Sequence, residues 1–104
     1  MVVVVFRSRL REGVDLTRLS AVGARMYELA SSMPGFLSYK DFVAEDGESV
    51  SIVEFEDDAS VLAWHAHPEH RAVQELARAE YFAAYHVQVC APIRERRFPT
   101  KTPT

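Results

Sequence analysis

The 104-residue sequence predicts an α+β protein in which helices cover one face of a four-stranded antiparallel sheet. Three observations predict this fold. Four stretches are rich in β-branched and aromatic residues, helical periodicity occurs between them, and an Asp-Gly dipeptide at 46–47 joins two of the strands. The resulting order, β-α-β-β-(αα)-β, is that of the split βαβ, ferredoxin-like arrangement.

Val2–Leu10 is predicted to be the first strand, and its residues 2–6 are apolar without alternation. Such a run indicates a central strand that is buried on both faces. Asp15 or Thr17 can cap the helix that follows, because either side chain can accept from free N–H groups of the first turn. Gly23 lies in the middle of this helix at a cost of about 1 kcal/mol relative to alanine, which predicts a close approach to a neighbouring element. The apolar stripe of the helix consists of Leu16, Leu19, Val22, Met26, Leu29 and Met33.

A hairpin is predicted next, with strands over Phe36–Glu45 and from Glu48 onwards. Asp-Gly supplies the two positive φ angles of a two-residue type I′ turn. That turn pairs Phe42 with Ser51, so both faces of the hairpin mix apolar and polar residues. Neither face is therefore expected to be a plain solvent face.

Two helices joined at Pro68 follow the hairpin. Asp57 is expected to cap the first, and Pro68 both ends that helix and begins the next. His67 can cap the second helix. A fourth strand is predicted at about Tyr85–Glu95, with Cys90 expected to be a buried small side chain rather than a nucleophile.

Length and composition predict one domain over residues 1–98 and a flexible tail over 99–104. The net charge of −3 gives no general attraction to nucleic acid. A single cysteine cannot form an internal disulfide, which favours a reducing compartment. The apolar run at 2–6 is too short for a membrane span or a signal peptide. The expectation is a soluble, cytoplasmic protein without nucleic-acid or membrane partners.

The apolar residues on the sheet face away from the helices need a partner, and a second copy of the sheet is the simplest one. A homodimer through the sheet face is therefore expected, with His86 at the interface.

Three of the four histidines and the only tryptophan lie near Pro68. Trp64 and His70 flank the proline, so a bend there can turn both toward one hollow, where His70 can act as a general base. A metal site is disfavoured because His65 and His67 point about 200° apart on a helix. Tyr81 or Tyr85 is expected to close the far end of the hollow.

Four stretches of the sequence occur together in a known family. They are Met33–Leu37, Phe55–Ala59, Trp64–Arg71 and Tyr81–Val89. Together they resemble the antibiotic biosynthesis monooxygenase family over residues 2 to about 97. The resemblance implies a dimeric α+β barrel, in a family that includes cofactor-independent oxygenases of aromatic polyketides, haem-degrading oxygenases and an isomerase.

The resemblance disfavours haem degradation. Trp64 matches the helix tryptophan of the haem-degrading branch, but the axial histidine falls on Gln74 and the first-strand asparagine falls near Phe6. For the polyketide oxygenases, the resemblance implies that Trp64, Arg71 or Arg78, and Tyr81 surround the substrate, although this chain contains no asparagine.

The resulting hypothesis is a cofactor-independent monooxygenase that uses no metal and acts on a small aromatic or quinone-like substrate. His70 and Trp64 are the predicted catalytic residues. The predicted substrate-binding residues are Trp64, His65, Arg71, Tyr81 and Tyr85. The alternatives are a non-catalytic ligand-binding or stress-related module of the same fold, or an isomerase.

Overall fold

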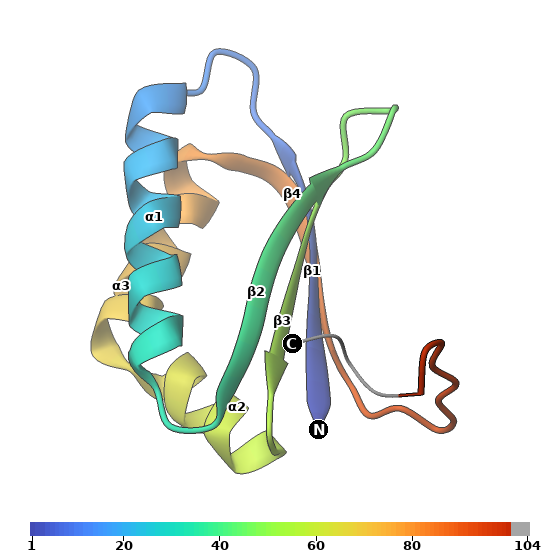
Figure 1. The fold of residues 1–104 in the computed structure, drawn as a ribbon. Coiled ribbons are helices and arrows are strands. Elements are labelled where there is room, and N and C mark those ends of the chain that lie inside the picture. Colours follow the sequence, from blue (N-terminus) through green and yellow to red (C-terminus); the bar gives the residue numbers. More distant parts are fainter. Residues whose placement is uncertain (101–104) are drawn as a thin grey trace.

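A computed structural model describes residues 1–100 and has the predicted element order (Figure 1). The elements are β1 (Val2–Leu10), α1 (Leu16–Ser32), β2 (Phe36–Val43), β3 (Ser49–Phe55), α2 (Asp58–Ala66), α3 (Pro68–Glu80) and β4 (Phe82–Cys90). The strands form one antiparallel sheet in the order β2-β3-β1-β4, so β1 is an interior strand, as predicted.

All three helices lie against one face of the sheet, and within the described residues no helix covers the other face (Figure 1). We call this second surface the open face. No helix of the described residues is long and apolar enough to cross a membrane. Of the predicted tail, residues 101–104 lie outside the described part of the chain.

The predicted helix caps are confirmed. The carboxylate of Asp15, rather than the hydroxyl of Thr17, begins α1 by accepting from the backbone N–H of Arg18. Asp57 caps α2 in the same way. At α3 the imidazole Nδ1 of His67 accepts from the backbone N–H of Glu69 at 3.1 Å.

The predicted two-residue turn between β2 and β3 is wrong, although the hairpin is present. The N–H of Ala44 donates to the carbonyl of Glu48 at 2.8 Å, which leaves a three-residue loop at 45–47. A type I′ turn needs two positive φ angles. Only Gly47 has one, at 88°, and among the described residues every positive φ belongs to a glycine.

The extra loop residue shifts the hairpin register by one. Phe42 therefore pairs with Val50 rather than with Ser51, which pairs with Asp41 instead. Because neighbouring side chains on a strand point to opposite faces, the shift moves Phe42 and Val50 to the open face together. It also places Asp41 and Ser51 on the helix side. β2 ends at Val43, two residues before the predicted Glu45.

The fourth strand also differs from its prediction, since it runs over Phe82–Cys90 instead of about Tyr85–Glu95. Its last paired residue, Cys90, lies opposite Val3, close to the beginning of β1, so no partner remains for the apolar residues beyond it. Cys90 is exposed, and the expectation that it is buried is wrong for the single chain.

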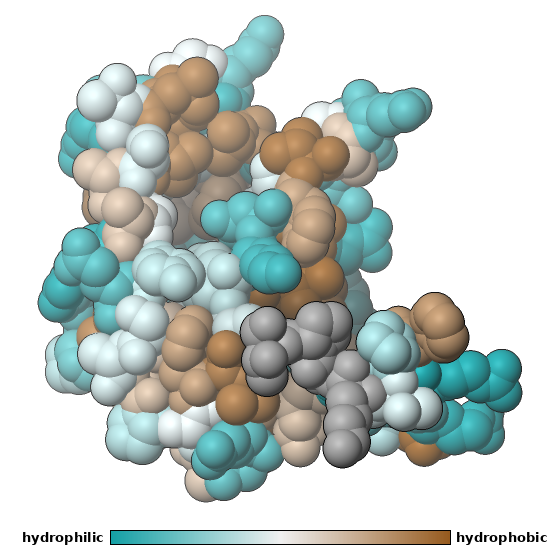
Figure 2. All heavy atoms as spheres, viewed as in Figure 1, coloured by the Kyte–Doolittle hydropathy of each residue, from teal (hydrophilic) through white to brown (hydrophobic). Residues whose placement is uncertain are grey.

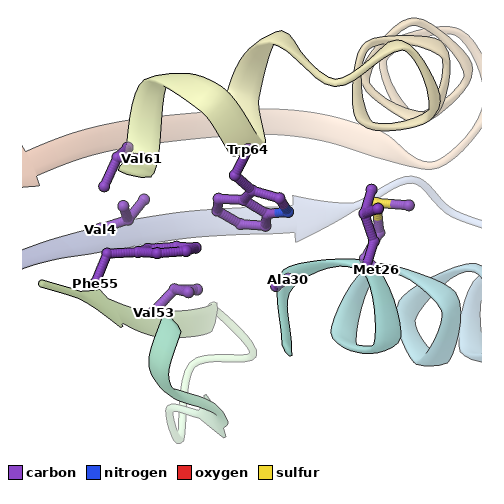
Figure 3. Close-up of a cluster of buried hydrophobic side chains, with 8 residues drawn as sticks. Val4, Met26, Ala30, Val53, Phe55, Val61 and Trp64 are labelled. Carbon is purple, nitrogen blue, oxygen red and sulfur yellow. The ribbon is translucent and has the colours of Figure 1, made fainter. Parts of the chain in front are cut away.

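The core lies where the sheet meets α1 and α2 (Figure 3). Phe55 and Val53 are the largest fully buried side chains, and the Trp64 ring packs on Phe55 with ring centroids 5.5 Å apart. The whole cluster consists of Val4, Met26, Leu29, Ala30, Val53, Phe55, Val61 and Trp64.

Gly23 of α1 does not make the predicted close approach. A Cβ placed on it would meet no heavy atom within 4 Å, so this expectation is wrong. Gly23 borders a cavity instead.

Candidate active site

A cavity of about 870 Å³ lies between the helices and the sheet. Its lining comes from all four strands and all three helices and is mostly apolar. Figure 2 shows the molecule hollowed between the helix layer and the β2–β3 hairpin, with hydrophobic residues on both sides. The volume is in the range of small-molecule sites, and a mostly apolar lining with a few polar groups is typical of them.

The bend at Pro68 brings Trp64 of α2 and His70 of α3 into contact, with ring centroids 4.5 Å apart. Both side chains line the cavity, as the sequence predicts. In Figure 3 the indole nitrogen of Trp64 lies on the side of the ring toward Met26, away from Phe55. Trp64 therefore packs its ring in the core and is also part of the cavity wall.

Three polar atoms of residues that line the cavity are buried and unpaired. Trp64 Nε1, His70 Nδ1 and Tyr81 Oη have no hydrogen-bond partner among residues 1–100. All three side chains line the cavity. A buried unpaired polar group costs about 1–3 kcal/mol, so a ligand that pairs with these atoms recovers that free energy.

The pKa of His70 is lowered to about 4. Burial is the main cause, since it disfavours the charged imidazolium, and the neighbouring His65 adds to it. Contact with the backbone of His65 opposes the shift in part. His70 is therefore neutral at pH 7 and has one ring nitrogen free to accept a proton or a hydrogen bond.

A second polar group lies on the sheet side of the cavity, and sequence reasoning missed it. The hydroxyl of Ser51 donates to Asp41 Oδ1 at 2.5 Å, and both residues line the cavity. Tyr39 lies next to them and packs edge-on against Trp64. Burial, with a smaller effect of Asp41, raises the pKa of the Tyr39 phenol. The correct hairpin register would have placed these residues on the helix side.

Of the other predicted site residues, three line the cavity and one does not. His65 lines the cavity, with its Nδ1 3.3 Å from Nε2 of Gln74. Tyr81 is buried and Tyr85 is exposed, and both line the cavity. Arg71 is exposed and is not among the lining residues.

The far end of the cavity holds an aromatic group. Tyr85 stacks on Phe6 with centroids 5.6 Å apart, and Phe82 packs against both rings. The Tyr85 hydroxyl accepts from Nη1 of Arg78 at 3.3 Å. Arg78 thus reaches the cavity through Tyr85 and is not itself a lining residue.

Within residues 1–100, no group of three or more His, Cys, Asp and Glu side chains is arranged to hold a metal ion. His65 and His70 are neighbours, with ring centroids 5.5 Å apart. The Nδ1 of His67 is used to cap α3.

Comparison with known proteins points to one family. The model of the antibiotic biosynthesis monooxygenase family matches residues 1–76, which include Trp64 and His70. No curated protein matches the sequence.

Solved structures share the fold at low sequence identity. Rv0793 from Mycobacterium tuberculosis is 21% identical with a TM-score of 0.79, and the match covers 92% of this chain and 98% of that one. SnoaB, a cofactor-independent oxygenase from Streptomyces nogalater, is 18% identical with a TM-score of 0.75, over 90% and 94% of the two chains. A dimeric ferredoxin-like protein of unknown function from Thermobifida fusca is 16% identical with a TM-score of 0.70, over 88% and 90%.

Proposed function

The chain belongs to the antibiotic biosynthesis monooxygenase family, and from this we propose that it is a cofactor-independent monooxygenase. Its substrate is a small aromatic or quinone-like molecule bound in the cavity between sheet and helices. SnoaB, which has the same fold, is a cofactor-independent oxygenase, and this supports the proposal.

One observation carries the proposal. An apolar cavity of about 870 Å³ is lined by three side chains with buried, unpaired polar atoms: Trp64 and His70, which are in contact, and Tyr81 at the other end of α3. A flat ring with a carbonyl or hydroxyl oxygen fits this combination. The apolar walls hold the ring, while the indole N–H of Trp64 can donate to its oxygen.

In the proposed reaction, the substrate carries an acidic CH₂ group next to a carbonyl, as in an anthrone. His70 takes one proton from it, and the resulting carbanion reduces O₂ and forms a C–O–O bond. Loss of water then leaves a new carbonyl, so that CH₂ and O₂ give C=O and H₂O. The protein contributes orientation, a dry site and one base.

The low pKa of His70 limits its strength as a base in the empty cavity. A carbanion formed beside the ring raises the proton affinity of the imidazole by ion pairing. The indole donor near the substrate oxygen stabilises the same negative charge, which makes the substrate itself more acidic.

The same pKa supports a second candidate function, which is ligand binding without turnover. A weak base suits a hydrogen-bond acceptor at least as well as it suits a catalyst. The two functions share the cavity and differ only in whether O₂ is consumed.

Oxygen uptake with anthrone as substrate tests the proposal. Purified protein is expected to consume O₂ and release anthraquinone. His70→Ala should lower the rate by about 10²–10⁴-fold, the range for loss of a general base, while folding stability changes by about 1 kcal/mol. Trp64→Ala should reduce both rate and stability, because removing a buried aromatic ring costs about 3–5 kcal/mol.

Leu16→Ala is the control, because Leu16 is exposed on α1 and does not line the cavity. It should keep the native rate. Full activity in His70→Ala would refute the role of His70, and no uptake above the uncatalysed rate with the native protein would favour the binding function.

The open face is proposed to bind a second copy of the chain. Its central residues are apolar and half-buried, although no other element covers them in the described part of the chain. They are Val3, Val5, Val50 and Ile52, next to the exposed Phe42. The related fold from Thermobifida fusca is dimeric, which supports this proposal.

A further inference from the structure

We propose that Gly23 determines how large a ligand the cavity accepts, by keeping the space beside α1 open for fused aromatic rings. This inference rests on the proposed function, because it concerns the ligand of the same cavity.

Gly23 of α1 borders the cavity beside the apolar stripe of the helix. It lies four residues after Leu19 and three before Met26, which places all three on one face of the helix. Met26 is buried in the core, and all three residues line the cavity. Val22 continues the apolar stripe of α1 between Leu19 and Met26, and Gly23 lies beside the stripe as an exposed position on the cavity side.

The backbone does not require a glycine at this position. Gly13, Gly35 and Gly47 have positive φ angles, whereas Gly23 does not. Close packing does not require it either, because an added Cβ would have no heavy atom within 4 Å. Glycine also weakens a helix interior relative to alanine. What the glycine provides is empty space.

That space extends the part of the cavity next to Trp64. Met26 lies near the polar edge of Trp64 (Figure 3), and Gly23 is one helical turn beyond it. A ring held at Trp64 can therefore continue along α1 past Gly23 if no side chain projects there. Among the lining residues in the described part of the chain, Gly23 is the only glycine.

The experiment measures binding of phenol, naphthol and anthrone, which have one, two and three fused rings, under argon. Fluorescence of Trp64, the only tryptophan, reports occupancy of the cavity. Gly23→Leu should raise the Kd of anthrone at least about tenfold, equivalent to 1.4 kcal/mol. It should leave the Kd of phenol within about twofold.

Ala21→Leu is the matched control, because Ala21 is exposed on α1 and does not line the cavity. It should leave all three affinities unchanged. Gly23→Ala should raise the Tm by about 2–8 °C, since alanine favours the helix and meets open space.

The inference fails if Gly23→Leu weakens anthrone no more than phenol, or if Gly23→Ala lowers the Tm. If the native protein binds none of the three probes, the proposed function fails as well, so the two failures are distinguishable.

Discussion

Trp64 belongs both to the core and to the cavity wall, and His70 lines the cavity beside it. Trp64 is only 7% exposed and packs on Phe55, yet its indole nitrogen has no partner in residues 1–100. The imidazole of His70 lies against the Trp64 ring. The sequence predicts this pair because Pro68 bends the chain between them. The sequence does not predict that Asp41 and Ser51 line the cavity, because the face on which they lie depends on the hairpin register. The length of the loop at 45–47 sets that register.

Stability should depend on pH through His70. Its pKa is about 4 in the folded chain and about 6.5 when unfolded, so between these values the unfolded state binds more protons. The stabilising effect of the neutral ring is complete above pH 6.5 and is lost as the pH falls toward 4. The slope from this group is at most about 1.4 kcal/mol per pH unit.

Urea unfolding at pH 7 and pH 5 measures this effect. His70→Gln should show a smaller difference between the two pH values than the native protein. An unchanged pH difference in His70→Gln would show that other groups cause it.

At the scale of elements, local chemistry predicts the helices and their ends better than the strand register. Asp57, His67 and Pro68 act on the residues beside them, so their roles can be read from the sequence. The hairpin is different, because Asp-Gly fits both a two-residue and a three-residue loop. The choice depends on whether Asp46 takes a positive φ, and it does not.

The end of β4 shows the same limit. Apolar residues continue to Ile93, but the strand stops at Cys90, close to where its partner β1 begins. Ile93 is 90% exposed. The length of β4 depends on how many residues of β1 remain to pair with it, and the residues of β4 alone do not show this.

The turn from α1 to β2 should tolerate no side chain at Gly35. Its φ is +83°, and an added Cβ would overlap the side chain of Ser60. Gly35→Ala should therefore destabilise the protein by about 1–3 kcal/mol, from backbone strain and this contact together.

Gly13→Ala separates the two causes, because Gly13 has a φ of +71° but open space around it. It should cost less than Gly35→Ala. Adding Ser60→Gly should recover part of the loss at Gly35. Equal losses at Gly13 and Gly35 in chemical denaturation would contradict the contact with Ser60.

For the whole molecule, the one-sided arrangement of helices leaves β1 half-covered. Residues 2–6 predict burial on both faces, whereas the single chain buries Val4 and leaves Val3 and Val5 half-buried. A sheet-to-sheet dimer would cover Val3 and Val5, so that β1 would be buried on both faces as the sequence pattern predicts.

Light scattering should give a mass of about twice the 11.8 kDa of one chain. Val5→Glu should shift the protein toward the monomer, because it places a charge in the proposed interface. Leu16→Glu, at an exposed site on α1, should leave the mass unchanged. A native mass near that of one chain at micromolar concentration would refute the dimer.

The central claim is that an aromatic molecule binds in the cavity beside Trp64 and His70. Nitrogen-15 NMR on adding anthrone under argon tests it most directly, since the single tryptophan gives one indole N–H signal. We expect that signal and the His70 ring nitrogens to shift together in a saturable way. Unchanged Trp64 and His70 signals, with shifts at Val5 and Ile52 on the open face, would contradict the account.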